Sequence, residues 1–120
     1  VVRDEEPGSA VRLADRLGLA ALQLHGREPA QAVADIRKSF GGEIWTAGFE
    51  DRGGDRLVFD SPGGGTGRPC DWAAVAAHPA RAWAFLAGGI GPDNARAAQK
   101  TGVHGLDASS RLESAPGMKD

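Results

Sequence analysis

Two carboxylates lie at the ends of short apolar runs, where a reactive group is well placed. Asp60 ends the run RLVFD and Asp107 follows VHGL. A carboxyl group at a strand end can act as a general acid. It can equally cap the loop that follows, because Asp side chains commonly bond to nearby backbone N–H groups. For Asp107 the alternatives are a place near a substrate or a loop ion pair with Arg111. The residue types alone favour the cap for Asp60 and leave Asp107 open.

A second group of residues is of the kind that binds an anion. Gly88 and Gly89 form a Gly-Gly pair, and Ser109, Ser110 and Arg111 follow the last apolar run. Backbone N–H groups of such loops bind phosphate, and a guanidinium pairs with it directly. The alternatives are a plain tight turn for the glycines, a helix cap for the serines, and crowding of the loop by the arginine.

Three further residues have chemistry that the pattern does not assign firmly. His25 ends the run LQLH at a strand end, where a structural hydrogen bond is favoured over direct catalysis. Asn94 stands at the start of a helix, where capping is favoured over substrate contact. Cys70 is the only cysteine, so it cannot form an internal disulfide, and it suits a small buried position.

The elements that must position these residues alternate between strands and helices. Helices are predicted from a Ser9 cap to Gly18, over residues 27–42 with Pro29 in the first turn, over 72–78 after an Asp71 cap, and over 92–100. Strands are predicted at 19–24, 43–49, 56–60 and 81–89, the last strand and its loop at 103–110, a glycine-rich loop at 61–69 and a polar tail at 111–120. This alternation is typical of parallel βαβ units, and both a doubly wound sheet and a barrel accommodate it.

Composition excludes several classes of protein. The net charge of -2 offers no basic surface for nucleic acid and no polybasic patch for a membrane. No apolar run is long enough to span a bilayer, and the acidic start VVRDEEPG is unlike a signal peptide. We therefore expect a cytoplasmic protein that binds neither nucleic acid nor membrane.

Five motifs, in order, resemble those of phosphoribosylanthranilate isomerases. They are LQLHG at 22–26, FDSPGGGTGRPCDW at 59–72, LAGGIGPDN at 86–94, GLDASS at 105–110 and ESAPGMKD at 113–120. The resemblance implies an α/β fold, a partial (βα)8 TIM barrel of the ribulose-phosphate-binding type, with parallel strands and outer helices. A whole barrel of this kind takes about 250 residues. Residues 1–120 are accordingly expected to be a single domain, an incomplete isomerase barrel.

The resemblance also implies a reaction. The family converts N-(5-phosphoribosyl)anthranilate to 1-(2-carboxyphenylamino)-1-deoxyribulose 5-phosphate in tryptophan biosynthesis, by an Amadori rearrangement without metal or cofactor. By resemblance Asp60 is the general acid, and the phosphate site falls at Gly88, Gly89, Ser109 and Ser110. Asp107, His25 and Asn94 lie near the substrate, and Arg111 stands where the family usually has glycine.

The resemblance also breaks at several places. The family's general base is a cysteine in a KICG-like first strand, which is absent here, and Cys70 does not replace it. The substrate-orienting arginine loop and the closing helix are absent too. Residues 50–54 leave no room for the usual crossover helix, because a parallel connection needs about a dozen residues. A truncated isomerase is favoured, which should need a partner, a second copy or the missing segments; the expected partners are a second copy of the chain and a fused tryptophan-pathway domain. The alternatives are a non-catalytic phosphate-binding or scaffold module, and a relative of thiamine-phosphate synthase, against which the motifs argue.

Overall fold

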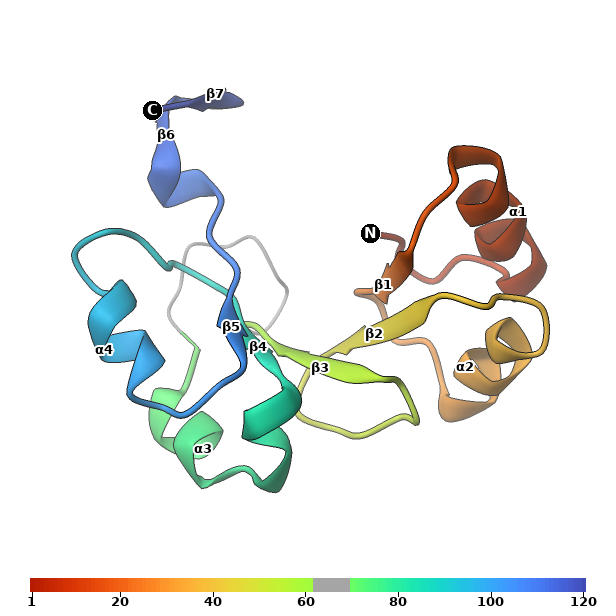
Figure 1. The fold of residues 1–120 in the computed structure, drawn as a ribbon, viewed down its shortest axis with the longest axis horizontal. Coiled ribbons are helices and arrows are strands. Elements are labelled where there is room, and N and C mark those ends of the chain that lie inside the picture. The colour runs from red at the N-terminus through yellow and green to blue at the C-terminus, as the bar shows by residue number, and fades with distance from the viewer. Residues whose placement is uncertain (62–69) are drawn as a thin grey trace. The chain divides into compact units, whose positions relative to one another are not determined.

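The computed structural model describes residues 1–61 and 70–120. The chain divides into two compact units, Val1–Leu57 and Val58–Asp120. Most of the predicted glycine-rich loop, residues 62–69, lies outside the described residues. The α/β class is confirmed in both units, because each contains parallel strands joined to helices (Figure 1).

The first unit is built on two parallel strands covered by two helices. Its elements are α1 (Pro7–Leu17), β1 (Ala21–Leu24), α2 (Ala30–Arg37) and β2 (Glu43–Ala47), and β3 (Arg56–Phe59) begins at its end. β1 and β2 pair from Ala21↔Glu43 to Leu24↔Thr46, and Val2 adds a parallel bridge to Leu24. Alternate strand residues are buried against the helices, as a strand with one covered face requires. This core contains Ala10, Val11, Ala14, Leu22, Leu24, Val33, Ile36, Phe40 and Ile44.

The helix ends follow local chemistry, with one correction. Gly18 ends α1 in the left-handed conformation at φ 61°, as predicted. The predicted Ser9 cap is wrong, because the Glu6 carboxylate accepts the Gly8 and Ser9 N–H groups, each at 2.9 Å. Pro7 lacks an N–H and suits the first helical position, so the cap lies three residues earlier than predicted, at Glu6.

The second unit continues the parallel pattern. Its elements are the end of β3, α3 (Trp72–Ala77), a 3-10 helix (Pro79–Trp83), β4 (Phe85–Leu86), α4 (Ala95–Gln99) and β5 (Gly105–Leu106). β3 pairs with β4, and β4 with β5, both in parallel. The Asp71 cap is confirmed, with its carboxylate 3.1 Å from the Ala74 nitrogen.

Two predicted elements of this unit are wrong in extent or type. The strand predicted at 81–89 is reduced to Phe85–Leu86, because residues 79–83 form the 3-10 helix, whose first turn is capped by the His78 ring nitrogen at 3.1 Å from the Ala80 nitrogen. The tail contains a short 3-10 helix (Ser110–Leu112) and an antiparallel hairpin, β6 (Glu113–Ala115) with β7 (Met118–Lys119), where only a polar segment was expected.

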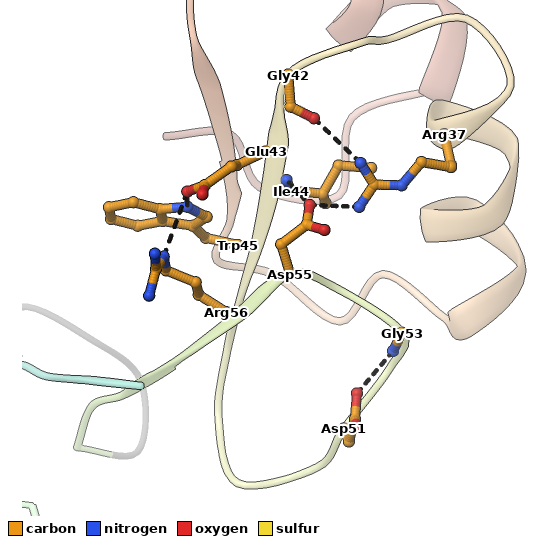
Figure 2. A network of polar contacts seen from close by, with 9 residues as sticks. All are labelled: Arg37, Gly42, Glu43, Ile44, Trp45, Asp51, Gly53, Asp55 and Arg56. Carbon is orange, nitrogen blue, oxygen red and sulfur yellow. Dashed lines mark hydrogen bonds and ion pairs between the residues drawn. The ribbon is translucent and has the colours of Figure 1, made fainter. Parts of the chain in front are cut away.

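No helix lies between β2 and β3, as the short linker predicted. Asp55 closes this connection through its backbone and its side chain (Figure 2). Its N–H donates to the Ile44 carbonyl at 2.7 Å, and its carboxylate accepts the Ile44 N–H at 2.7 Å and pairs with Arg37. Arg37 also donates to the Gly42 carbonyl at 3.1 Å. The connection between β2 and β3 contains no crossover helix. Its end is fixed by these backbone hydrogen bonds and by the ion pair.

Gly54 is expected to be intolerant of a side chain for lack of space. A Cβ there would lie 2.8 Å from the Ile44 carbonyl oxygen and 3.1 Å from Thr46 Cγ2. We expect Gly54→Ala to lower the free energy of unfolding by about 1–3 kcal/mol, the usual cost of overpacking, measured by urea denaturation. Gly41→Ala is the matched control, since a Cβ at Gly41 meets nothing within 4 Å. Equal midpoints for the two variants would contradict this expectation.

Candidate functional site

A cavity of about 120 Å³ lies in the second unit at the carboxyl ends of three parallel strands. Asp60 follows β3, Ala87 follows β4, and Asp107 follows β5. Carboxyl ends of parallel strands meet at one edge, which is where α/β proteins bind their ligands. The lining residues are Asp60, Ala87, Gly88, Gly89, Ile90, Asp107, Ser109 and Ser110. Six candidate residues from the sequence are therefore brought together.

The turn after β4 presents unused backbone donors to this cavity. Gly88 and Gly89 have φ values of 83° and 69°, which glycine adopts without strain. Within residues 1–61 and 70–120, the N–H groups of Gly88, Gly89 and Ile90 find no acceptor, and the same holds for Ser109 and Ser110. Clustered N–H groups without acceptors form an anion-binding concavity.

The two carboxylates of the cavity have different surroundings. Asp60 is half-buried, and its Oδ1 accepts the Ser61 N–H at 2.7 Å. Asp107 is exposed, and its N–H donates to the Leu86 carbonyl at 2.9 Å, which continues the pairing of β4 and β5. The suggested ion pair between Asp107 and Arg111 is absent from the described contacts, because Arg111 pairs with Asp93 instead.

Lys119 in the terminal hairpin reaches the serine loop, a contact that the sequence did not indicate. Its Nζ lies 3.1 Å from both the Oγ and the carbonyl oxygen of Ser109, and 2.7 Å from Glu113. The hydrogen bond from Lys119 lowers the pKa of the Glu113 carboxyl below its ordinary value. The hairpin thereby brings a cation to the edge of the cavity.

Arg111 and Asn94 do not line the cavity but hold the glycine turn beside it. Arg111 Nη2 lies 2.8 and 2.9 Å from the two Asp93 oxygens, and Nη1 lies 3.2 Å from the Gly89 carbonyl. The Asn94 amide donates to the same Gly89 carbonyl at 2.9 Å and accepts the Gly91 N–H at 2.9 Å. Both side chains therefore act on the backbone of the turn.

His25 lies in the first unit, directly after β1, and its N–H donates to the Val2 carbonyl at 2.9 Å. The loop that follows it is anchored by Glu28, which the sequence did not single out. Glu28 is buried, accepts the Asp4 N–H at 2.8 Å, and lies 3.5 Å from Arg52. Arg52 in turn donates to the carbonyls of Glu28 and Ala47, at 2.7 and 2.6 Å.

Cys70 is buried, as expected for a small apolar residue. Burial raises the pKa of its thiol to about 11, and the negative charges of Asp60 and Asp71 act in the same direction. The thiol is therefore protonated at neutral pH.

Among residues 1–61 and 70–120, no group of His, Cys, Asp and Glu side chains could hold a metal ion. In the same residues, no helix is both long enough and apolar enough to cross a membrane.

Comparisons with known proteins agree on one family. The sequence model of the N-(5'-phosphoribosyl)anthranilate isomerase family matches residues 1–120. An N-(5'-phosphoribosyl)anthranilate isomerase from Deinococcus radiodurans is 37% identical over 92% of this chain and 59% of its own length. The crystal structure of the enzyme from Thermus thermophilus has a TM-score of 0.85 at 28% identity, over 98% of this chain and 63% of that one. A further isomerase structure, in complex with reduced 1-(o-carboxyphenylamino)-1-deoxyribulose 5-phosphate, has a TM-score of 0.76 at 25% identity, over 99% and 62% of the two chains.

The chain spans about six tenths of the length of these proteins. Its parallel strands and their order along the chain agree with a partial barrel. The match to the family model from the first residue to the last, together with the cavity at the strand ends, shows that the chain belongs to the N-(5'-phosphoribosyl)anthranilate isomerase family.

Proposed function

We propose that the protein containing this chain isomerises N-(5'-phosphoribosyl)anthranilate to 1-(2-carboxyphenylamino)-1-deoxyribulose 5-phosphate in tryptophan biosynthesis, in the cytoplasm. One observation carries the proposal. A half-buried carboxylate lines the same cavity as five residues whose backbone N–H groups have no acceptor within residues 1–61 and 70–120. A sugar phosphate needs both kinds of group, one for its reacting end and one for its anion.

The phosphate is assigned to the two loops that follow β4 and β5. Gly88, Gly89 and Ile90 come from the loop after β4, Ser109 and Ser110 come from the loop after β5, and all five line the cavity. Loops after the last two strands of a barrel often bind phosphate. The isomerase structure with a bound deoxyribulose 5-phosphate derivative supports this class of ligand.

Asp60 is assigned as the general acid. It donates its proton to the furanose ring oxygen, and the bond from C1 to that oxygen breaks as the nitrogen lone pair forms a C1=N double bond. A base then removes the C2 proton, and the electron pair left at C2 forms C1=C2 and neutralises the nitrogen. The resulting enolamine becomes the ketone by tautomerisation, so no oxidant or cofactor is consumed.

The base is assigned to a part of the protein outside these residues. The family's base is a cysteine in a motif that this sequence lacks. Cys70 does not serve, because a thiol with a pKa of about 11 is almost wholly protonated at pH 7 and the thiolate is the reactive form. The second candidate function, a non-catalytic phosphate-binding module, predicts phosphate binding without a contribution from Asp60.

Replacing Asp60 separates the two functions. In the full-length protein, Asp60→Asn should lower kcat by about 10²-fold or more, the scale of general acid catalysis, and leave phosphate binding intact. Asp15→Asn is the control, because Asp15 is exposed on α1 and its substitution removes the same charge at a different place. Turnover is followed by the loss of substrate fluorescence. An Asp60→Asn protein that turns over like Asp15→Asn would refute the acid assignment.

The 120-residue chain alone should show no turnover, because it lacks the base.

The Cys70 thiol should also resist alkylation by iodoacetamide in the folded state at pH 7.5 and react once the chain is unfolded in urea. Mass spectrometry measures the labelling, and Cys70→Ser is the control for both assays. Isomerase activity of the chain that Cys70→Ser abolishes would show that Cys70 is the base after all.

A further inference from the structure

Arg111 belongs to the loop after β5 but makes its contacts on the loop after β4. We propose that Arg111 is a positioning residue of the phosphate site, which holds the Gly89 carbonyl so that the Ile90 N–H is presented to the substrate phosphate. This proposal rests on the proposed function, because it deepens the role of the same cavity.

The guanidinium of Arg111 contacts two residues of one turn. Its Nη2 lies 2.8 and 2.9 Å from the Asp93 oxygens and its Nη1 lies 3.2 Å from the Gly89 carbonyl. A planar fork with fixed donors suits this simultaneous contact, whereas a single ammonium does not. The hydrogen bond from Arg111 lowers the pKa of Asp93, so the carboxylate is charged at neutral pH.

Gly91, which has no side chain, leaves the space that the Arg111 side chain occupies. A Cβ at Gly91 would lie 3.0 Å from Arg111 Cβ, 3.2 Å from its Nε and 3.3 Å from the Asp93 carboxylate. The arginine side chain therefore lies directly against the backbone of the turn. The arginine and the glycine that makes room for it form one arrangement.

The orientation of the Gly89–Ile90 peptide follows from these contacts. Arg111 and Asn94 both donate to the Gly89 carbonyl, at 3.2 and 2.9 Å. In a trans peptide the carbonyl and the following N–H point in opposite directions. The Ile90 N–H therefore points away from both side chains, and Ile90 lines the cavity with that N–H unpaired among the described residues. The Ile90 N–H is therefore oriented before phosphate binds, so no free energy is lost in orienting it during binding.

The charge of Arg111 is already engaged by Asp93, so the two possible roles of the arginine predict opposite effects of removing Asp93. If Arg111 orients the turn, removing Asp93 weakens the hold of Arg111 on the Gly89 carbonyl and therefore weakens phosphate binding. If Arg111 contacts the phosphate directly, freeing it leaves a cation without its partner and strengthens binding. The ion pair is largely exposed, so its contribution to folding is small and a binding effect is not a consequence of unfolding.

The test uses the full-length protein and two probes, inorganic phosphate by calorimetry and the substrate by steady-state kinetics. We expect Arg111→Met and Asp93→Asn each to raise the Kd for phosphate and the KM by about 5–10-fold, the scale of one ordinary hydrogen bond, with kcat within about twofold. The double variant should equal either single one, because both remove the same contact. Arg96→Met, an exposed arginine on α4, is the control for lost charge.

Three results would overturn the proposal. Tighter phosphate binding by Asp93→Asn would assign Arg111 to the phosphate itself. An Arg111→Met protein with wild-type Kd and KM would remove any role for the arginine, while Gly89→Val, which blocks backbone approach, should still weaken binding if the proposed function holds. A wild-type protein that neither binds phosphate nor turns over the substrate would overturn the proposed function and this inference together.

Discussion

Parallel pairing of β3, β4 and β5 is the constraint on which the cavity depends. Because the strands run in one direction, the residues that follow them emerge at one edge, although they are far apart in the sequence. The backbone bonds from Ala87 to Phe59 and from Asp107 to Leu86 continue that pairing to the rim of the cavity. Reversing any one strand would remove a carboxylate or a set of N–H groups from the site.

In the second unit, three polar side chains hold groups that border the cavity without lining it themselves. Asn94 and Arg111 both donate to the Gly89 carbonyl, and Lys119 donates to Ser109. Each of these contacts fixes a peptide or a hydroxyl that borders the cavity. Preorganised backbone dipoles of this kind bind charge without rearranging first.

Most of the elements could be predicted, and six of the residues singled out from the sequence line one cavity, because periodicity, caps and motif order are local properties of the sequence. Asp71 as a cap and Gly18 as a helix end followed from residue type alone. Two failures are local. Glu6 displaced Ser9 as a cap because Pro7 moved the helix start, and the terminal hairpin closes around Gly117 within seven residues. The others concern contacts between distant residues, because neither the Arg111–Asp93 pair nor the Glu28–Arg52 pair leaves a trace in the local sequence pattern.

The Asp55 contacts seen in Figure 2 have a consequence for how this connection can vary between relatives. The Asp55 N–H and carboxylate both meet the Ile44 peptide groups, and Arg37 holds the carboxylate from α2. These contacts fix the register of the returning chain at Asp55, its last residue before β3. Residues 48–50, before the turn at Asp51–Gly53, take no part in the Asp55 contacts. Insertions and deletions should accumulate there across evolution, whereas the spacing from Gly54 to Arg56 should be invariant in length.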